Sequence, residues 1–142
     1  MIVRKQPLIL HNILGVEKKL TWRQCIEAAV ELKDRLLQNG VYSTGPVVYR
    51  IGSLEKQSEL LIPMGFKVNL PEGHGFYFKE TLQIDEGLKV RVAEPKEEME
   101  DALALLESTA KQMNVKLEKP YYNISIAVPG GTIVDVYAPI VS

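Results

Sequence analysis

Thiols and imidazoles are scarce in this sequence. Its 142 residues contain one cysteine, Cys25, and two histidines, His11 and His74. A single cysteine excludes an internal disulfide and fits a reducing cytoplasm, where we expect the chain to be located. Cys25 stands in a helical pattern, and we interpret it as a small buried hydrophobic residue. Neither histidine has a partner at metal-ligand spacing and no nucleophile motif is present, so we predict no metal site, no cofactor and no catalytic residues.

Long apolar runs and an excess of one charge are also absent. The longest apolar stretches are far too short to span a bilayer, and the N-terminal MIVRKQPLIL lacks the layout of a signal peptide. The formal net charge is −1, and lysine and arginine are dispersed along the chain. We therefore expect neither a nucleic-acid partner nor a membrane partner. The length and apolar content predict a single domain, residues 1–142.

Two segments have the apolar spacing of an amphipathic helix. The first covers residues 21–39 and begins with the pattern of a capping box, in which Thr21 is followed by Gln24. The second runs from about 95 to 113, with a proline at its first position and acids in its first turn. The apolar face expected for the first helix comprises Trp22, Ile26, Ala29, Val30, Leu36 and Leu37.

Both helices stand in the same setting. One strand-like segment precedes each helix and two short ones follow it, which predicts the order β-α-β-β twice. Landmarks recur at a nearly constant spacing: "GPVVY" from Gly45 corresponds to "KPYYN" from Lys119, and Pro63 of "SELLIPM" corresponds to Pro139 of "VDVYAPI". We predict that one unit occurs twice, with a first repeat of about 1–66, a linker of about 67–75 and a second repeat of about 76–142.

Two copies can bury what one copy cannot. A single copy leaves its helix or its sheet face without a partner, whereas two copies related by a pseudo-twofold axis can join their strands into one antiparallel sheet. The predicted fold class is therefore α+β. We expect a duplicated β-α-β-β unit with pseudo-twofold symmetry, in which a curved antiparallel sheet has two helices on one face and a central groove on the other.

These segments resemble a known family. The duplicated unit, "TGPVVYRI" from Thr44 to Ile51, and the closing "VDVYAPI" from Val134 to Ile140 resemble the GyrI-like small-molecule-binding domain. This is the effector-binding domain fold of multidrug-responsive transcription regulators. The resemblance implies an open sheet that holds hydrophobic, often cationic, molecules against aromatic walls. It also implies an acid on a central strand that neutralises the ligand; that position is often glutamate, and here it is Asp135.

The chain contains no helix-turn-helix segment, so the resemblance is to a stand-alone member. Some stand-alone members of that family sequester or hydrolyse toxic small molecules.

Alternation along the strands selects the candidate site. In the last strand Asp135 and Tyr137 share one face, and the small aliphatic residues between them suit packing beneath a helix. The same argument places Glu59 and Leu61 on the groove face of the first copy. Aromatic rings and a partly desolvated carboxylate together attract a lipophilic cation. The predicted ligand-binding residues are Tyr49, Glu59, Phe78, Tyr121, Asp135 and Tyr137.

Three functions fit these residues. The leading one is a stand-alone protein that binds a hydrophobic or cationic small molecule. The second is a hydrolase of an electrophilic toxin, with Glu59 or Asp135 as general base and a tyrosine donating to the developing anion. The third is an interaction module that docks a peptide or a second copy in the same groove. We expect a monomer or homodimer whose partner is a small molecule, with lipophilic cations among the candidates.

Overall fold

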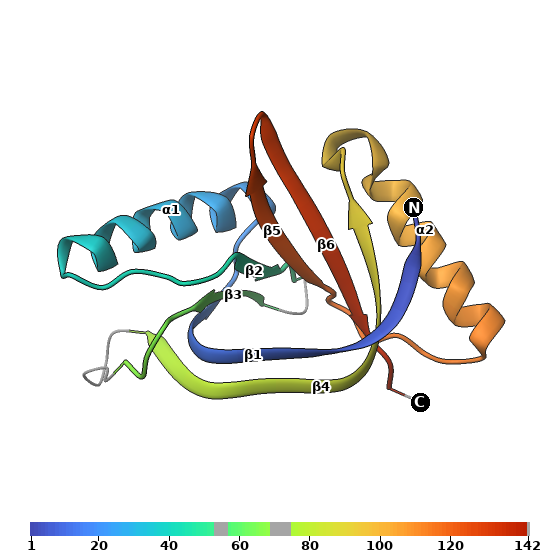
Figure 1. Ribbon diagram of the computed structural model, residues 1–142, viewed down its shortest axis with the longest axis horizontal. Helices are drawn as coiled ribbons and strands as arrows, with labels where there is room; N and C mark the ends of the chain where they lie inside the picture. Colours follow the sequence, from blue (N-terminus) through green and yellow to red (C-terminus); the bar gives the residue numbers. More distant parts are fainter. Residues whose placement is uncertain (53–56, 69–74, 142) are drawn as a thin grey trace. The chain divides into compact units, whose positions relative to one another are not determined.

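The computed structural model describes residues 1–52, 57–68 and 75–141 (Figure 1). Most of the predicted linker, His74 included, lies outside these residues. Within them the chain forms six strands and two helices. The elements are β1 (Val3–Lys18), α1 (Trp22–Gln38), β2 (Val47–Arg50), β3 (Ser58–Pro63), β4 (Phe76–Val92), α2 (Pro95–Met113), β5 (Tyr122–Val128) and β6 (Gly131–Pro139). The predicted α+β class and the antiparallel pairing are confirmed.

The chain divides into two compact units, and their boundaries fall inside strands. Unit 1 consists of Met1–Ile9 and Gln83–Ser142, and unit 2 of Leu10–Leu82. The long strands β1 and β4 therefore each contribute one part to each unit. The predicted boundary between the repeats lies in the linker, whereas the boundaries between the units lie inside β1 and β4. The repeat boundaries stay a prediction.

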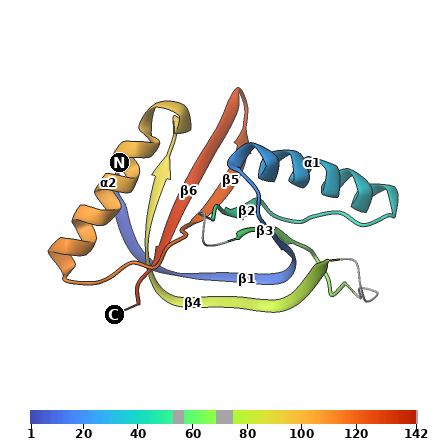
Figure 2. The ribbon, with the colours of Figure 1, turned by 180° about the vertical axis from the view of Figure 1, so that it is seen from behind.

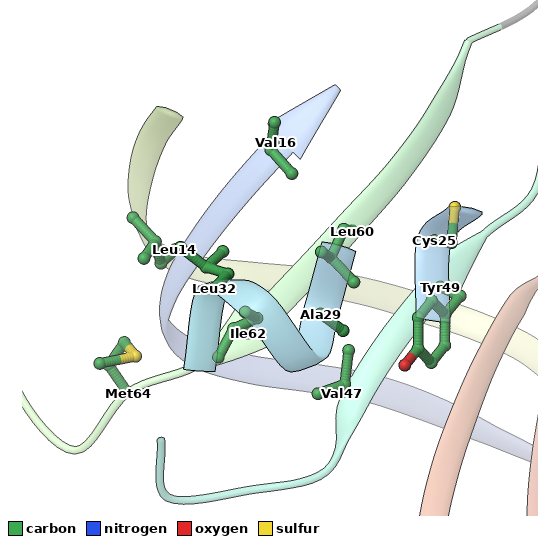
Figure 3. Packing of buried hydrophobic residues seen from close by; sticks show 10 residues of the cluster. All are labelled: Leu14, Val16, Cys25, Ala29, Leu32, Val47, Tyr49, Leu60, Ile62 and Met64. Atoms are coloured by element: carbon green, nitrogen blue, oxygen red, sulfur yellow. The ribbon is translucent and has the colours of Figure 1, made fainter. Parts of the chain in front are cut away.

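In unit 2, α1 covers one face of the strands β1, β3 and β2. β3 pairs antiparallel with both neighbours. Because side chains alternate along a strand, every second residue of β3, such as Leu60 and Ile62, points toward α1. Figure 3 shows these side chains together with Cys25, Ala29 and Leu32 of the helix. The whole group, called the α1 cluster here, comprises Leu14, Val16, Cys25, Ala29, Leu32, Val47, Tyr49, Leu60, Ile62 and Met64.

The start of α1 confirms the capping box. The backbone N–H of Gln24 donates to the Thr21 hydroxyl at 3.3 Å, and the Thr21 N–H donates to the Gln24 side chain at 2.9 Å. These two bonds satisfy donors that the first helical turn leaves without partners.

The apolar face predicted for α1 is wrong in part. Ile26, Val30 and Leu37 are exposed, whereas Cys25 and Leu32 are buried. The helix carries two overlapping apolar stripes, and the strands accept the one with the small residues because these allow close approach. The interpretation of Cys25 as a buried residue is confirmed.

In unit 1, α2 covers one face of the strands β4, β6 and β5 (Figures 1 and 2). Three residues of the helix are buried, Ala102, Leu106 and Ala110. They belong to a second group, called the α2 cluster here: Leu88, Val90, Val92, Ala102, Leu106, Ala110, Tyr121, Val134, Val136 and Ala138. The prediction that the small aliphatic residues of the last strand pack beneath a helix is therefore confirmed. Neither helix of the described chain is long and apolar enough to cross a membrane.

The strand registers of the two units correspond. Glu17 pairs with Glu59 in unit 2, and Arg91 pairs with Asp135 in unit 1. The first members of these pairs are 74 positions apart and the second members 76. The same two offsets relate the bridge between residues 43 and 64 to that between residues 117 and 140. These registers support the duplication, which stays a prediction together with its symmetry.

Candidate functional site

The face of unit 1 away from α2 has a charged row beside an aromatic row. Residues directly opposite one another on antiparallel strands share a face. The strand registers place two rows side by side, Arg91, Asp135 and Ile124 in one and Lys89, Tyr137 and Tyr122 in the other. We call these six residues the Asp135 face. The predicted orientation of Asp135 and Tyr137, opposite to the residues of the α2 cluster, agrees with this arrangement.

Two cationic side chains hold the carboxylate of Asp135. Arg91 donates through Nε to Oδ1 at 2.8 Å and through Nη2 to Oδ2 at 3.0 Å. Nζ of Lys89 lies 3.2 Å from Oδ2. The parallel bonds from the guanidinium match the geometry of a carboxylate and are among the stronger hydrogen bonds in proteins. The carboxylate of Asp135 is therefore already neutralised by the chain itself.

The pKa of Asp135 reflects this pairing. Only 2% of the residue is exposed. Burial by itself raises the pKa of a carboxyl group, but the hydrogen bonds and charges of Arg91 and Lys89 outweigh burial and leave the pKa of Asp135 below its usual value. A carboxylate with a lowered pKa and two cationic partners is a poor general base.

Two tyrosine rings lie next to this ion cluster. The rings of Tyr122 and Tyr137 meet edge to face, with centroids 6.4 Å apart and planes at 65°. The Tyr137 hydroxyl donates to the backbone carbonyl of Gln6 at 2.8 Å. Burial, with smaller contributions from Tyr122 and Asp85, raises the pKa of Tyr137 to about 12. Tyr137 therefore remains a neutral aromatic group at any physiological pH.

Arg91 and Lys89 form the solvent-facing side of the cluster. The side chain of Arg91 is 60% exposed and that of Lys89 is 28% exposed, whereas that of Asp135 is 3% exposed. The two cations thus lie between the carboxylate and the solvent.

Unit 2 has a second acid on the corresponding face. Glu59 accepts a hydrogen bond from the Tyr77 hydroxyl at 2.6 Å and one from Arg50 at 3.2 Å. The side chains of Glu59 and Arg50 are each 20% exposed. The Tyr77 ring lies against Gly15, where an added Cβ would come within 2.2 Å of the ring. We call Glu59, Arg50 and Tyr77 the Glu59 cluster.

The six predicted site residues separate into two groups. Glu59, Asp135 and Tyr137 lie on faces turned away from the helices. Tyr49 belongs to the α1 cluster, close to Cys25 in Figure 3, and Tyr121 belongs to the α2 cluster. For these two residues a ligand-binding role stays a prediction, and the structure gives them a packing role.

Phe78 lies with the helix-side residues too. Alternation puts it on the same side of β4 as Phe76, which packs against the α1 cluster. The aromatic residues that accompany the two acids are Tyr77 and Tyr122, the immediate neighbours of Phe78 and Tyr121 in the sequence. Because the side-chain period of a strand is two, neighbouring residues lie on opposite faces. A ligand-binding role for Phe78 stays a prediction.

The basic partners were not predicted. Arg91 is 44 positions from Asp135 in the sequence, and only the register of β4 against β6 makes them neighbours. The available signal was the alternation of Lys89 and Arg91 with three apolar residues in "LKVRV", which marks them as one face of a strand.

A separate cavity lies on the other side of unit 2. It has a volume of about 260 Å³ and is located between α1 and the strands. It is lined by Val16, Lys18, Leu20, Ala28, Glu31, Leu32, Arg35, Leu60 and Phe76. Its charged residues are Lys18 and the ion pair Arg35–Glu31, and the rest of its wall is apolar. None of the six predicted ligand-binding residues is among the residues that line it.

Metal binding has no support from the described part of the chain. In residues 1–52, 57–68 and 75–141 no three histidine, cysteine, aspartate or glutamate side chains come together as ligands. Asp135 and Glu59 have arginine partners instead. The groups present on these faces are tyrosine rings and paired charges.

No protein-family model matches the chain, and no curated protein matches its sequence. Several solved structures do match its fold. The crystal structure of a hydrolase from Listeria innocua superposes with a TM-score of 0.59 at 9% identity, over 97% of this chain and 92% of that chain. An uncharacterised conserved protein from the same organism gives a TM-score of 0.59 at 11% identity over the same shares, 97% and 92%. The structure of SAV2435 bound to tetraphenylphosphonium gives 0.52 at 13% identity, over 100% of this chain and 95% of that chain.

These likenesses cover nearly the whole chain and show its fold. One of the matching proteins holds a lipophilic cation and another is a hydrolase. Membership of the GyrI-like family stays a prediction, with which these matches are consistent.

Proposed function

We propose that this chain is a small-molecule-binding protein whose ligand is hydrophobic and lies against the Asp135 face. The observation on which the proposal depends is the placement of two tyrosine rings, Tyr122 and Tyr137, beside an ion cluster on the sheet face opposite α2. The rings are 6% and 0% exposed, so a ligand reaches them by displacing the groups that cover them. Apolar walls with a few oriented polar groups are typical of ligand sites. The fold supports the proposal, because a protein of the same fold holds tetraphenylphosphonium.

The aromatic contribution can be tested directly. A thermal-shift screen of the purified chain against hydrophobic cations, anions and neutral aromatic compounds should find compounds that raise the unfolding midpoint. A ligand at about a hundred times its dissociation constant adds about 2.7 kcal/mol to the free energy of unfolding. Tyr122→Leu removes one ring of the pair, and we expect the affinity of a hit to fall about tenfold.

Tyr42→Leu is the matched control, because Tyr42 is exposed and belongs to neither cluster. Stabilisation by no compound, or equal affinities for the native chain and Tyr122→Leu, would contradict the proposal.

A hydrolytic activity is the second candidate, and one contact favours a particular pair for it. The Glu59 carboxylate and the Tyr77 hydroxyl are 2.6 Å apart, which brings a base and a hydrogen-bond donor to one point. In such a reaction Glu59 would take a proton from water, and the Tyr77 hydroxyl would turn from Glu59 to donate to the developing oxyanion. Asp135 is the weaker candidate for the base, because Arg91 and Lys89 lower its pKa.

Hydrolysis of a panel of activated esters and epoxides tests this candidate. Glu59→Gln should abolish turnover, and Tyr77→Phe should reduce kcat by roughly a hundredfold, the usual effect of losing a catalytic proton donor or acceptor. Asp135→Asn is the informative comparison: if Asp135→Asn abolishes turnover and Glu59→Gln retains it, the assignment to Glu59 is wrong.

A further inference from the structure

We infer that Arg91 and Lys89 set the charge preference of the Asp135 face, so that it accepts anionic hydrophobic molecules in preference to cations of the same shape. The inference rests on the proposed function, since it names the ligand class of the same site. It reverses the expectation from the family resemblance, in which an acid on this strand neutralises a cationic ligand.

The charges in direct contact lead to this inference. Asp135 contributes one negative charge, and Arg91 and Lys89 contribute two positive charges within 3.2 Å of its oxygens. The formal charge of the cluster is therefore +1. Asp135 and Lys89 are buried or half-buried, where charge interactions are screened less than at the surface.

The hydrogen bonds of Asp135 also disfavour a cationic ligand. Both oxygens of Asp135 already accept hydrogen bonds, from a bidentate arginine on one side and from a lysine at Oδ2. A cationic ligand would have to displace one of these partners to reach the carboxylate. The bonds lost with the displaced partner count against the affinity of that ligand.

Exposure makes the cations the first charges that a ligand meets. The Arg91 side chain is 60% exposed and the Asp135 side chain 3%. The rings of Tyr122 and Tyr137 are 6% and 0% exposed, so an anion that approaches from solvent meets Arg91 first. It can accept hydrogen bonds from the outward edge of Arg91 without disturbing the bonds of Arg91 to Asp135. Arginine suits this double role because its guanidinium has five N–H donors, of which two bond Asp135.

Two ions of nearly identical shape and opposite charge provide the test. Tetraphenylphosphonium and tetraphenylborate each present four phenyl groups around a central atom. Their dissociation constants for the native chain, measured by isothermal titration calorimetry in a potassium-free buffer, should differ by about tenfold or more in favour of the borate. Comparing the two ions cancels the hydrophobic contribution and leaves the effect of charge.

Both variants remove the charge of Asp135, so that this buried carboxylate is never left without its cationic partners. The neutral variant Lys89→Gln/Arg91→Gln/Asp135→Asn removes all three charges and should bind both ions equally. Arg91→Gln/Asp135→Asn removes one charge of each sign, keeps Lys89, and should retain the preference for the borate. A circular dichroism spectrum and an unfolding midpoint for each variant establish that it is folded.

Lys18→Gln is the matched control. It removes one positive charge from the cavity beneath α1 and leaves the Asp135 face unchanged. We expect it to keep the native preference. If Lys18→Gln abolishes the preference and the neutral variant does not, the ions bind in the cavity and the inference is wrong.

The other outcomes are equally decisive. Tighter binding of the phosphonium than of the borate by the native chain overturns the inference and leaves the proposed function standing. If the native chain binds neither ion, the inference is wrong and the proposed function does not extend to hydrophobic ions. If a neutral aromatic compound binds in that case, the proposed function stands and only the inference is lost.

Discussion

Burial makes the charge of Asp135 dependent on its neighbours. A carboxylate that is 2% exposed loses most of its hydration, and in this chain the bonds from Arg91 and Lys89 replace it. The net effect is a pKa for Asp135 below the ordinary value, despite burial. The same contacts that make Asp135 a structural anchor make it a poor partner for an external cation.

This lowered pKa predicts a loss of stability in acid. A group whose pKa is depressed by folding stabilises the folded state above its unfolded pKa, about 4, and that contribution disappears as the pH falls through the folded value. Asp135→Asn should lower the free energy of unfolding at pH 7, and its difference from the native chain should shrink as the pH falls below about 4. Urea titrations at several pH values measure this, with exposed Asp34→Asn as control. A difference that is constant with pH would contradict the role of Asp135.

The raised pKa of Tyr137 predicts a loss of stability in alkali. Its pKa is about 12 in the folded chain, against 10.0 for an ordinary tyrosine. Between these values the unfolded chain loses the phenolic proton while the folded chain keeps it, so stability falls as the pH rises. The difference between these two pKa values corresponds to about 3 kcal/mol over the whole range. In urea titrations from pH 9 to pH 12, Tyr137→Phe should lose less stability than the native chain; parallel curves would show that Tyr137 is not the group responsible.

Gly87 has a defined reason to be glycine. A Cβ at this position would lie 2.2 Å from Cζ of Tyr137, so the ring can rest on β4 only where no side chain is present. We expect Gly87→Ala to displace the ring and to cost about 1–3 kcal/mol. Gly131→Ala is the control, because no atom lies within 4 Å of its added Cβ. Equal unfolding midpoints for the two variants would refute the contact.

At the scale of elements, the start of α1 is a local feature with a measurable effect. Both bonds of its capping box are present, one from each of Thr21 and Gln24. Thr21→Ala should lower the free energy of unfolding by about 1 kcal/mol. Gln24→Ala removes only the second bond and replaces glutamine by a better helix former, so we expect a smaller loss. If Gln24→Ala costs more than Thr21→Ala in urea unfolding, the threonine hydroxyl is not the principal cap.

The helices and strands could be predicted from sequence because their signals are local. The capping box, the proline at the start of α2 and the alternation in β6 each depend on a few consecutive residues. The buried face of a helix is harder to predict when the sequence has two apolar stripes, as the exposed Val30 and the buried Leu32 of α1 show. The strands that α1 meets decide between the stripes, and they lie elsewhere in the sequence.

The candidate site was predictable for its acids and not for their partners. Val134 and Val136 on either side of Asp135 identify its face. In "YY" and "FYF" the successive residues are all aromatic. The alternation of residue types therefore cannot distinguish Tyr122 from Tyr121, or Tyr77 from Phe78. The choice depends on register against a neighbouring strand, such as the pairing of Tyr122 with Tyr137.

For the whole molecule, the two strands shared between units determine how the chain can be divided. Unit 2 includes residues 76–82 of β4, and unit 1 includes residues 3–9 of β1. A fragment cut at the predicted linker, residues 1–66 for example, would therefore lack a strand segment of unit 2 and retain one of unit 1. We propose on this ground that the chain is one folding domain although it has two compact units.

Shared strands predict a single cooperative unfolding transition. Opening unit 2 would release the first part of β4, whose continuation belongs to unit 1, and opening unit 1 would release the start of β1 in the same way. The one tryptophan, Trp22, belongs to α1 of unit 2, whereas far-ultraviolet circular dichroism records both helices. Urea unfolding followed by these two signals should give the same midpoint. A tryptophan signal that changes at lower urea, while the helical signal of α2 persists, would instead establish two units that unfold independently.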